Sequence, residues 1–259
     1  MFTEAPAVNP SAHAVTQYAG TSKQLDARRG LLDYNTHSQG WYSWVGERIA
    51  IQGDVLEVGA GTGELWRHNN ASQARVVLTD FSPAMCEQLR QIPGVSSVVQ
   101  CDAAKLPFPD ASFDSVVAHH MLYHLDEPGA AIAEFARVLR PGGRLTVTLN
   151  GRTHLAELLE IGEEIGRPSV ILGAARITGE TGRESIEEHF VDVTEEVFPG
   201  GFDVPQSEPV LSYLGTWGDE PMSEEQERKA RAIIEAKIAT DGSFWVTKKM
   251  IVFVARKAS

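Results

Sequence analysis

The stretch Val55–Trp66, VLEVGAGTGELW, places three glycines at alternate positions directly after a short apolar run. An apolar strand that ends at Gly59 and leads through Gly61 and Gly63 into a helix is typical of a loop whose backbone approaches a nucleotide-like ligand. The two glutamates of this stretch disfavour a pyrophosphate, because both groups carry negative charge. We therefore expect the loop to hold a ligand with positive charge.

Enzymes that transfer a hydride from a dinucleotide use the pattern G-x-G-x-x-G in this loop. Here Glu64 occupies the position of the third glycine. An NAD(P)-dependent oxidoreductase is therefore the less favoured alternative.

Runs rich in β-branched residues alternate with helical patterns on both sides of the loop. Strands are expected at 54–59, 74–80, 95–102, 112–120 and 143–150, with helices at 63–68, 82–92 and 129–140. Such alternation is typical of a parallel sheet with helices on both faces, which binds ligands at the carboxyl ends of its strands. A helix is expected near 31–50, before the first strand. Beyond residue 150, helices are expected near 153–165, 183–189, 207–216 and 223–239, with a last strand over 244–255.

Acidic residues lie at the ends of three successive predicted strands, at Glu57, Asp80 and Asp102. Asp80 follows Gly59 by 21 residues, close to the separation at which a carboxylate accepts both hydroxyls of a ribose. Asp102, beside Ala103, is placed to accept from an adenine amino group. Each acid alone is more typical of a helix cap or turn, but together with the glycine loop the three acids predict an adenosine-containing ligand.

Five motifs follow one another in a characteristic order: E-V-G-A-G-T-G at 57–63, L-T-D-F-S at 78–82, C-D-A-A-K-L-P-F at 101–108, F-D-S-V-V-A at 113–118 and V-L-R-P-G-G-R-L at 138–145. This set resembles the class I S-adenosylmethionine-dependent methyltransferases, and most closely the branch that includes the ubiquinone and menaquinone methyltransferases. The resemblance implies a Rossmann-like, doubly wound α/β sheet of seven strands whose final strand, 244–255, is antiparallel, with N-terminal and post-core helical cap elements.

The resemblance also implies the cofactor S-adenosyl-L-methionine, whose sulfonium and ammonium groups suit an acidic loop. The residues that it assigns to cofactor binding are Glu57, Gly59, Ala60, Gly61, Gly63, Asp80, Phe81, Ser82, Asp102, Ala103 and His119. Glu57 is assigned to the ammonium and sulfonium side, Asp80 to the ribose, and Asp102 with Ala103 to the adenine edge. His119 stands where Asn or Ser is more usual, which leaves its contact open.

The catalytic candidates lie at the end of the fourth predicted strand or just past it, and they are His120, Tyr123 and His124. Methyl transfer needs a general base only when the acceptor must lose a proton, and His120 is the best-placed base. His120 and His124 lie four apart and would share a face if the segment were helical, but no third ligand is apparent and we expect no metal. The alternative is that these histidines pack and form hydrogen bonds without exchanging a proton in the reaction.

On the acceptor side, the candidates for substrate binding are Tyr18, Tyr34, Trp41 and His154. The aromatic residues, together with Tyr42 and Trp44, either form a lid over the cationic centre or pack an N-terminal helix.

The composition bounds the remaining alternatives. The chain has 259 residues and a formal net charge of −12, which disfavours nucleic acid and anionic membranes as partners. Between residues 183 and 228 there are 13 acidic and 2 basic residues, typical either of a solvated face or of an entrance for a cationic substrate. Two cysteines without metal-ligand spacing, and no basic region followed by a long apolar stretch, predict a cytoplasmic protein.

We expect a disordered tail at 1–17 and a single methyltransferase domain at 18–259, with its cofactor core at 53–150 and acceptor-side segments at 18–52 and 151–240. The predicted activity is methyl transfer from S-adenosylmethionine to nitrogen or oxygen of a small-molecule acceptor, in secondary metabolism. A non-catalytic protein that binds the cofactor is the other alternative, and the oligomeric state, a homodimer included, stays open.

Overall fold

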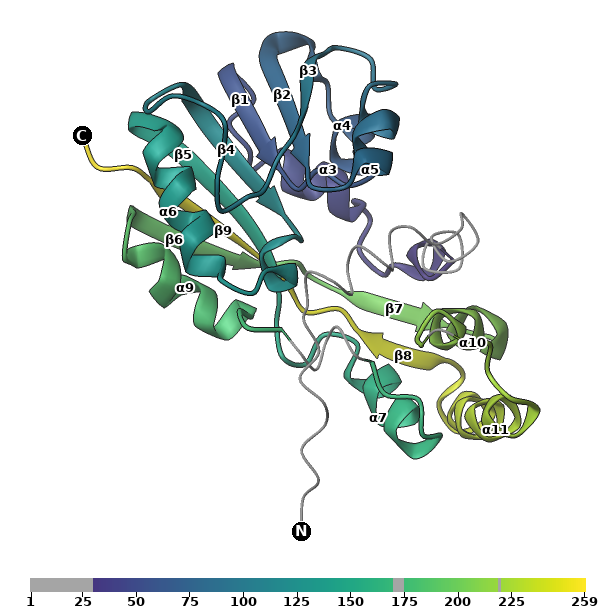
Figure 1. Cartoon of the computed structure of the whole chain (residues 1–259). Helices are drawn as coiled ribbons and strands as arrows, with labels where there is room; N and C mark the ends of the chain where they lie inside the picture. Colours follow the sequence, from purple (N-terminus) through teal and green to yellow (C-terminus); the bar gives the residue numbers. More distant parts are fainter. Residues whose placement is uncertain (1–29, 170–174, 219) are drawn as a thin grey trace. The chain divides into compact units, whose positions relative to one another are not determined.

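The computed structural model describes residues 30–169, 175–218 and 220–259 (Figure 1). The described chain divides into two compact units. The sheet unit contains residues 39–152, 176–199 and 249–259, and the helical unit contains the described parts of 1–38, 153–175 and 200–248. The predicted tail at 1–17 lies outside the described residues, and the single domain at 18–259 stays a prediction.

Seven strands form the sheet of the sheet unit, in the order β3-β2-β1-β4-β5-β9-β6 (Figure 1). They are β1 (Gly53–Val58), β2 (Ala74–Asp80), β3 (Val95–Gln100), β4 (Phe113–His119), β5 (Leu139–Asn150), β6 (Val191–Val197) and β9 (Met250–Arg256). The first five are parallel to one another, and β9 is antiparallel to both of its neighbours. The prediction of a Rossmann-like sheet of seven strands with a reversed final strand is confirmed.

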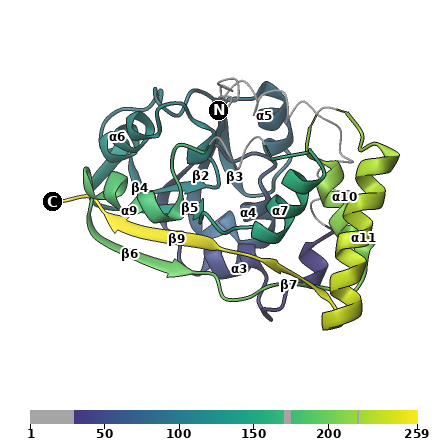
Figure 2. The same ribbon diagram turned by 90° about the horizontal axis from the view of Figure 1, so that it is seen from below.

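The prediction of one continuous last strand over 244–255 is wrong. The structure has two strands there, because β8 (Phe244–Thr247) pairs with β7 (Gly201–Val204) in a separate two-stranded sheet of the helical unit. Lys248 and Lys249 interrupt the apolar pattern, and the chain passes from one unit to the other between them. Figure 2 shows β9 beside β6 in the seven-stranded sheet.

Apolar side chains cover both faces of the parallel strands, because successive residues of a strand point to opposite faces. Leu56 of β1 belongs to one buried cluster, together with residues of α6 (Pro128–Val138) and α9 (Gly179–Glu187). The adjacent Val55 belongs to another, together with residues of α3 (Trp41–Gly46), α4 (Glu64–His68) and α5 (Pro83–Leu89). Helices therefore cover both faces, as the alternating pattern predicts.

The helical unit has its own apolar core. It contains η1 (Leu32–Tyr34), α7 (Ala156–Glu164), α10 (Ser207–Gly215) and α11 (Glu224–Asp241), which pack with β7 and β8 around a third buried cluster. The helix α11 begins with a capping box in which Ser223 Oγ accepts from Gln226 N and Gln226 Oε1 accepts from Ser223 N. None of the helices in the described ranges is long and apolar enough to span a bilayer.

The expected helix over 31–50 is replaced by two short pieces, η1 and α3. Asn35 between them is extended and Gly40 precedes the first turn of α3, so the apolar residues of this segment do not lie on one continuous helix. They are divided between the two units: Leu31 is buried in the helical unit, and Trp41 and Trp44 are buried in the sheet unit.

Candidate cofactor site and acceptor-side residues

The parallel pairing of β1 with β2 brings the glycine loop next to Asp80. Val58 pairs with Thr79, so both strands end at the same edge of the sheet. The backbone N–H of Gly61 donates to Asp80 Oδ2 at 2.8 Å, and that of Ser82 donates to Oδ1 at 2.8 Å. Burial raises the pKa of Asp80, while these backbone N–H groups oppose that shift. Each oxygen has further lone pairs, so the carboxylate is able to accept ribose hydroxyls as well.

Gly61 and Gly63 are required for different reasons. Both have positive φ, +57° and +76°, which a residue with a Cβ atom adopts only with strain. A Cβ atom at Gly61 would meet no other atom within 4 Å, so the loop is open there. At Gly63 it would lie 1.9 Å from Ile92 Cδ1, so that position is closed by packing. The open position at Gly61 fits a cofactor that lies against the loop.

Glu57 is a buried carboxyl group at the end of β1, with 1% of its surface exposed. It accepts a hydrogen bond from Trp66 Nε1. Burial raises the pKa of Glu57 to about 8; the bond from Trp66 lowers it, and the charge of Asp80 adds to the rise. A nearby cation would favour the ionised carboxylate, so the group is chemically suited to a cationic ligand.

The residues predicted to flank the adenosine have different surroundings. Phe81 is exposed, whereas Ser82 and Asp102 accept hydrogen bonds from nearby backbone N–H groups. Phe81 is 60% exposed directly after β2, which leaves an aromatic face available to a ligand. Ser82 caps α5 by accepting from Met85 N, and Asp102 Oδ1 accepts from Ala104 N at 2.9 Å. The turn role that the sequence left open is therefore present at Asp102, and Ser82 acts as a helix cap. The contacts of both residues with a cofactor stay predictions. Ala103 is buried.

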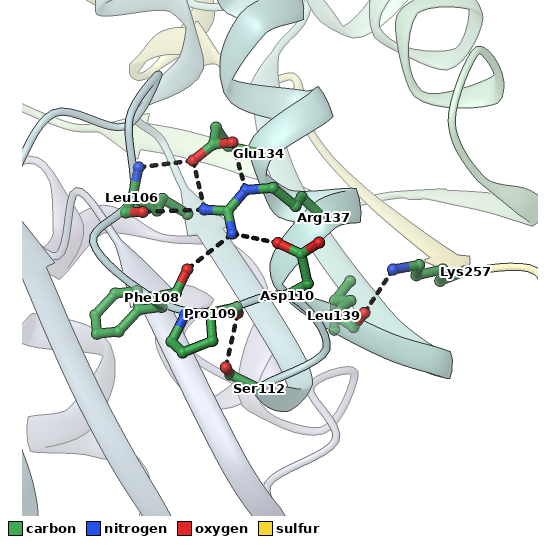
Figure 3. Close-up of polar contacts among 9 residues, drawn as sticks. All are labelled: Leu106, Phe108, Pro109, Asp110, Ser112, Glu134, Arg137, Leu139 and Lys257. Carbon is green, nitrogen blue, oxygen red and sulfur yellow. Dashed lines mark hydrogen bonds and ion pairs between the residues drawn. The ribbon is translucent and has the colours of Figure 1, made fainter.

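Arg137 on α6 anchors the loop between β3 and β4 that carries the predicted adenine-side residues (Figure 3). Its guanidinium donates to both carboxylate oxygens of Glu134, to Asp110 Oδ1, and to the carbonyl oxygens of Leu106 and Phe108, at 2.7–3.0 Å. All five N–H donors of the side chain are thus used. The helix α6 therefore fixes a loop from which cofactor-binding residues are predicted.

Aromatic and histidine rings gather where β4 ends. His119 is the last residue of β4, and its ring centroid lies 5.9 Å from that of Trp41, 5.7 Å from that of Tyr42 and 4.7 Å from that of His120. Burial lowers the pKa of His119 to about 3, although part of its surface is accessible. The ring of His119 is therefore neutral at physiological pH.

The helical face suggested for His120 and His124 does not form. His120 has φ +52° and lies in no helix, and His124 is the last residue of the short η3 (Leu122–His124). The rings of His120 and Tyr123 are 6.1 Å apart, and those of Tyr123 and His124 are 4.5 Å apart. The three catalytic candidates are thus neighbours, but within the described ranges no three His, Cys, Asp or Glu side chains form a group able to hold a metal.

The predicted acceptor-side residues lie in different units. Trp41 belongs to the sheet unit, where it is buried with Trp44, so packing is the alternative that the structure shows for both. Tyr34 and His154 belong to the helical unit, and Tyr18 lies outside the described residues. Their roles in substrate binding stay predictions.

Two polar residues near these sites, Thr148 and Lys248, were missed at the level of sequence. Thr148 is fully buried in β5, and Lys248, 4% exposed, has its Nζ 3.3 Å from Asn35 Oδ1 in the helical unit. Burial lowers the pKa of Lys248 to about 8, and burial and the charge of Lys248 lower that of His154 to about 3. A threonine in an otherwise apolar strand and a lysine between apolar runs were the available signals.

The acid-rich segment is in part an ion-paired surface. Arg183 pairs with Glu187 and Glu195, and Arg231 pairs with Glu208 and Glu227. These side chains are partly or largely exposed. The interpretation as a solvated face is therefore favoured over an entrance for a cation.

Comparison with known proteins gives a consistent family. The family described as "Methyltransferase domain" matches residues 56–147. The ubiquinone/menaquinone biosynthesis C-methyltransferase UbiE of Desulfotalea psychrophila is 30% identical over 230 residues, which cover 77% of this chain and 89% of the relative. The malonyl-[acyl-carrier protein] O-methyltransferase of Hahella chejuensis is 34% identical over 158 residues, which cover 51% of this chain and 57% of the relative.

A solved structure, phosphoethanolamine N-methyltransferase 2 of Haemonchus contortus in complex with S-adenosyl-L-methionine, has the same fold. It superposes with a TM-score of 0.60 at 18% identity, covering 98% of this chain and 61% of that one. With the glycine loop, Asp80 and the seven-stranded sheet in place, this chain belongs to the class I S-adenosyl-L-methionine-dependent methyltransferases, in the branch that includes the ubiquinone/menaquinone methyltransferases.

Proposed function

We propose that the protein transfers the methyl group of S-adenosylmethionine to carbon of a small-molecule acceptor. The Desulfotalea relative, which is similar over most of its length, is a C-methyltransferase, and this supports carbon. Oxygen is the second candidate, because the Hahella relative is an O-methyltransferase. Nitrogen, which the sequence also favours, has only a likeness of fold behind it. The role in secondary metabolism stays a prediction.

The observation that carries the proposal is the meeting of two groups of residues at one edge of the sheet. The strands β1, β2 and β4 are neighbours and parallel, so the glycine loop, Asp80 and the histidine cluster all follow carboxyl ends. We propose that Glu57, the loop 59–63, Asp80, Phe81 and the segment 102–103 hold the cofactor. The bound cofactor supplies a methyl group that its sulfonium already activates.

The chain's own part in the reaction is to bind, orient and, for a carbon or oxygen acceptor, remove a proton. His119 is a poor base, because burial lowers its pKa to about 3. His120 is therefore the proposed base, with Tyr123 and His124 beside it as alternatives. Tyr34, Trp41 and His154 are proposed to bind the acceptor.

A turnover screen with ¹³C-methyl-labelled S-adenosylmethionine over a metabolite library tests this function. NMR of the product identifies the methylated atom, and a carbon-bound methyl group supports the first candidate. A methyl group on oxygen or nitrogen overturns carbon in favour of that atom. Absence of any product, with the cofactor bound, favours the non-catalytic alternative.

The base assignment predicts that His120→Ala lowers turnover by roughly 10²-fold while the affinity for S-adenosylmethionine stays nearly unchanged. His68→Ala is the matched control, since His68 stacks on Tyr42 in the same unit but is half exposed. Steady-state kinetics with the acceptor from the screen measure the effect. Turnover of His120→Ala near that of the parent would transfer the role to Tyr123, His124 or solvent.

We further propose a cytoplasmic protein that does not bind nucleic acid. The described cysteines Cys86 and Cys101 are free thiols, which suits a reducing compartment. The net charge of −12 opposes binding to phosphate backbones.

A further inference from the structure

Thr148 is a buried polar residue that joins the two histidines at the end of β4. It lies on β5, directly opposite His119 in the parallel pair, and is fully buried. Its Oγ1 accepts from the backbone N–H of His120 at 2.9 Å and lies 3.1 Å from His119 Nδ1. The hydroxyl group of Thr148 therefore contacts the ring of His119 and the backbone of His120.

The direction of the second bond follows from the proton of the hydroxyl group. In the described parts of the chain, His119 Nδ1 is the acceptor within reach of the Thr148 hydroxyl. If Nδ1 carried a proton, the hydroxyl proton would be left without an acceptor at a fully buried position, which costs about 1–3 kcal/mol. His119 Nδ1 therefore accepts from Thr148, and the ring proton is on Nε2.

The surroundings of His119 keep this arrangement in place. Its ring stacks on the buried Trp41 with an interplanar angle of 29° and also contacts the half-buried Tyr42, so rotation of the ring would displace aromatic neighbours. Burial lowers the pKa of His119 to about 3, which keeps the ring neutral. The backbone of His120, at φ +52°, is held by the same hydroxyl group and by the carbonyl oxygen of Thr148.

We propose that Thr148 is a positioning residue that locks His119 as the neutral Nε2–H tautomer, so that His119 donates a hydrogen bond to an oxygen or nitrogen atom of a bound ligand and never takes a proton from it. The lock itself is independent of methyl transfer. Its use on the cofactor or the acceptor rests on the proposed function.

Histidine ¹H–¹⁵N correlation spectra of the ¹⁵N-labelled full chain test the lock, with His119→Gln to assign the ring signals. We expect the parent to show a single Nε2–H tautomer of His119 from pH 5 to 8. Thr148→Val removes the hydroxyl group at nearly constant volume, and we expect it to give a mixture of tautomers or a ring that titrates in this range. Thr148→Ser keeps a hydroxyl group and should restore the parental spectrum.

Thr146→Val is the matched control. Thr146 lies two residues earlier on the same strand and is equally buried, and its Oγ1 makes no hydrogen bond within the described ranges. This variant should leave the His119 spectrum unchanged. A parental tautomer in Thr148→Val, or an Nδ1–H signal in the parent, would overturn the proposal.

Calorimetric titration with S-adenosylmethionine on the same samples separates the two hypotheses. Failure of the parent to bind the cofactor would reject the proposed function while the tautomer result stood. A lost tautomer preference in Thr146→Val would reject the lock while cofactor binding stood.

Discussion

Single carboxyl groups organise the backbone and side chains of the proposed cofactor site. Asp80 accepts backbone N–H groups from both Gly61 and Ser82, so one side chain organises the turn after β1 and the turn after β2. Glu57 has a contrasting environment, since it is fully buried and accepts from the indole of Trp66. Asp80 is therefore suited to accept hydrogen bonds from a ligand. The charge that Glu57 presents depends on its protonation state.

Asp80→Ala should weaken binding of both S-adenosylmethionine and its demethylated product by roughly 1.5–3 kcal/mol. The variant loses charge-assisted hydrogen bonds to the ribose and the acceptor for the Gly61 N–H group. Isothermal titration calorimetry measures both affinities. Glu87→Ala, which removes an exposed carboxylate on α5, is the control and should bind like the parent. Unchanged affinity in a folded Asp80→Ala protein would remove the ribose assignment.

The parent protein should lose stability between pH 6.5 and 8 through Glu57, and Glu57→Gln should not show this part of the loss. The pKa of Glu57 is about 8 in the folded protein and 4.5 in the unfolded chain, so its stabilising contribution is complete below pH 4.5 and declines as the pH rises to 8. The free energy of unfolding of the parent should fall by roughly 2 kcal/mol from this group between pH 6.5 and 8. Glutamine cannot titrate and keeps an acceptor for Trp66.

Urea unfolding at both pH values compares the two proteins. His119 does not disturb the comparison, because its lowered pKa reduces stability only as the pH falls below 6.5. An equal fall in the parent and in Glu57→Gln would contradict the assignment.

At the scale of elements, the turn between β1 and α4 combines an open position and a closed one. Gly61 faces open space, and Gly63 packs against Ile92 after α5. The two glycines have similar backbone conformations, so the difference between them is one of surroundings. Substitutions at Gly61 and Gly63 can therefore distinguish an effect on cofactor binding from an effect on stability.

Gly61→Ala should chiefly weaken cofactor binding, and Gly63→Ala should chiefly lower stability. A left-handed conformation costs alanine about 1–2 kcal/mol at either position, and the contact with Ile92 adds roughly 1–3 kcal/mol at Gly63 alone. The added methyl group of Gly61→Ala enters the open side of the loop, and we expect at least tenfold weaker binding of S-adenosylmethionine. Denaturant unfolding and calorimetry on both variants test the ranking, and the reverse order would refute it.

The sequence predicts best those elements whose pattern is local. β1 to β5 carry β-branched runs, and their existence is confirmed, although β5 begins at Leu139, four residues before its predicted start at 143. β6 was missed because V-D-V-T-E-E-V reads as a solvated segment, although charged side chains are typical of an exposed edge strand. The division of 244–255 into two strands depends on pairing partners distant in the chain, which no local pattern contains.

The site follows the same division. The loop 59–63 is recognisable because strand and turn are adjacent in sequence, and Asp80 because it ends the next strand, 21 residues after Gly59. The structure brings the loop and Asp80 together. The bonds from Thr148 to His119 and from Trp66 to Glu57 depend on three-dimensional neighbours. The helical relation of His120 to His124 failed because a positive φ at His120 interrupts the segment.

At the scale of the molecule, the predicted roles are distributed unevenly over the two units, because Trp41 and the three catalytic candidates share the sheet unit with the cofactor residues. All residues assigned to the cofactor, from Glu57 to His119, lie in the sheet unit. Tyr34 and His154, which are assigned to the acceptor, lie in the helical unit with its separate core. Binding of the cofactor alone should therefore act on one unit.

Hydrogen–deuterium exchange with and without S-adenosylmethionine tests this division. We expect slower exchange in the segments after β1 and β2, and unchanged exchange in β7, β8 and α11, because only the sheet unit carries the proposed cofactor contacts. Asp80→Ala at the same cofactor concentration is the control and should show less protection. Equal protection of both units would contradict the assignment.

The position of β9 between β5 and β6 has a consequence for the order of folding. Leu145 pairs with Ala255 and Glu196 pairs with Val252, so β9 joins strands that are far from it in the chain. Such non-local contacts slow folding, because the chain loses the entropy of closing a long loop before the strand pairing contributes any favourable free energy. Until β9 inserts, β5 and β6 each present an unpaired edge, and such edges pair readily with other chains. The rate of this insertion is thus expected to set the aggregation hazard during refolding.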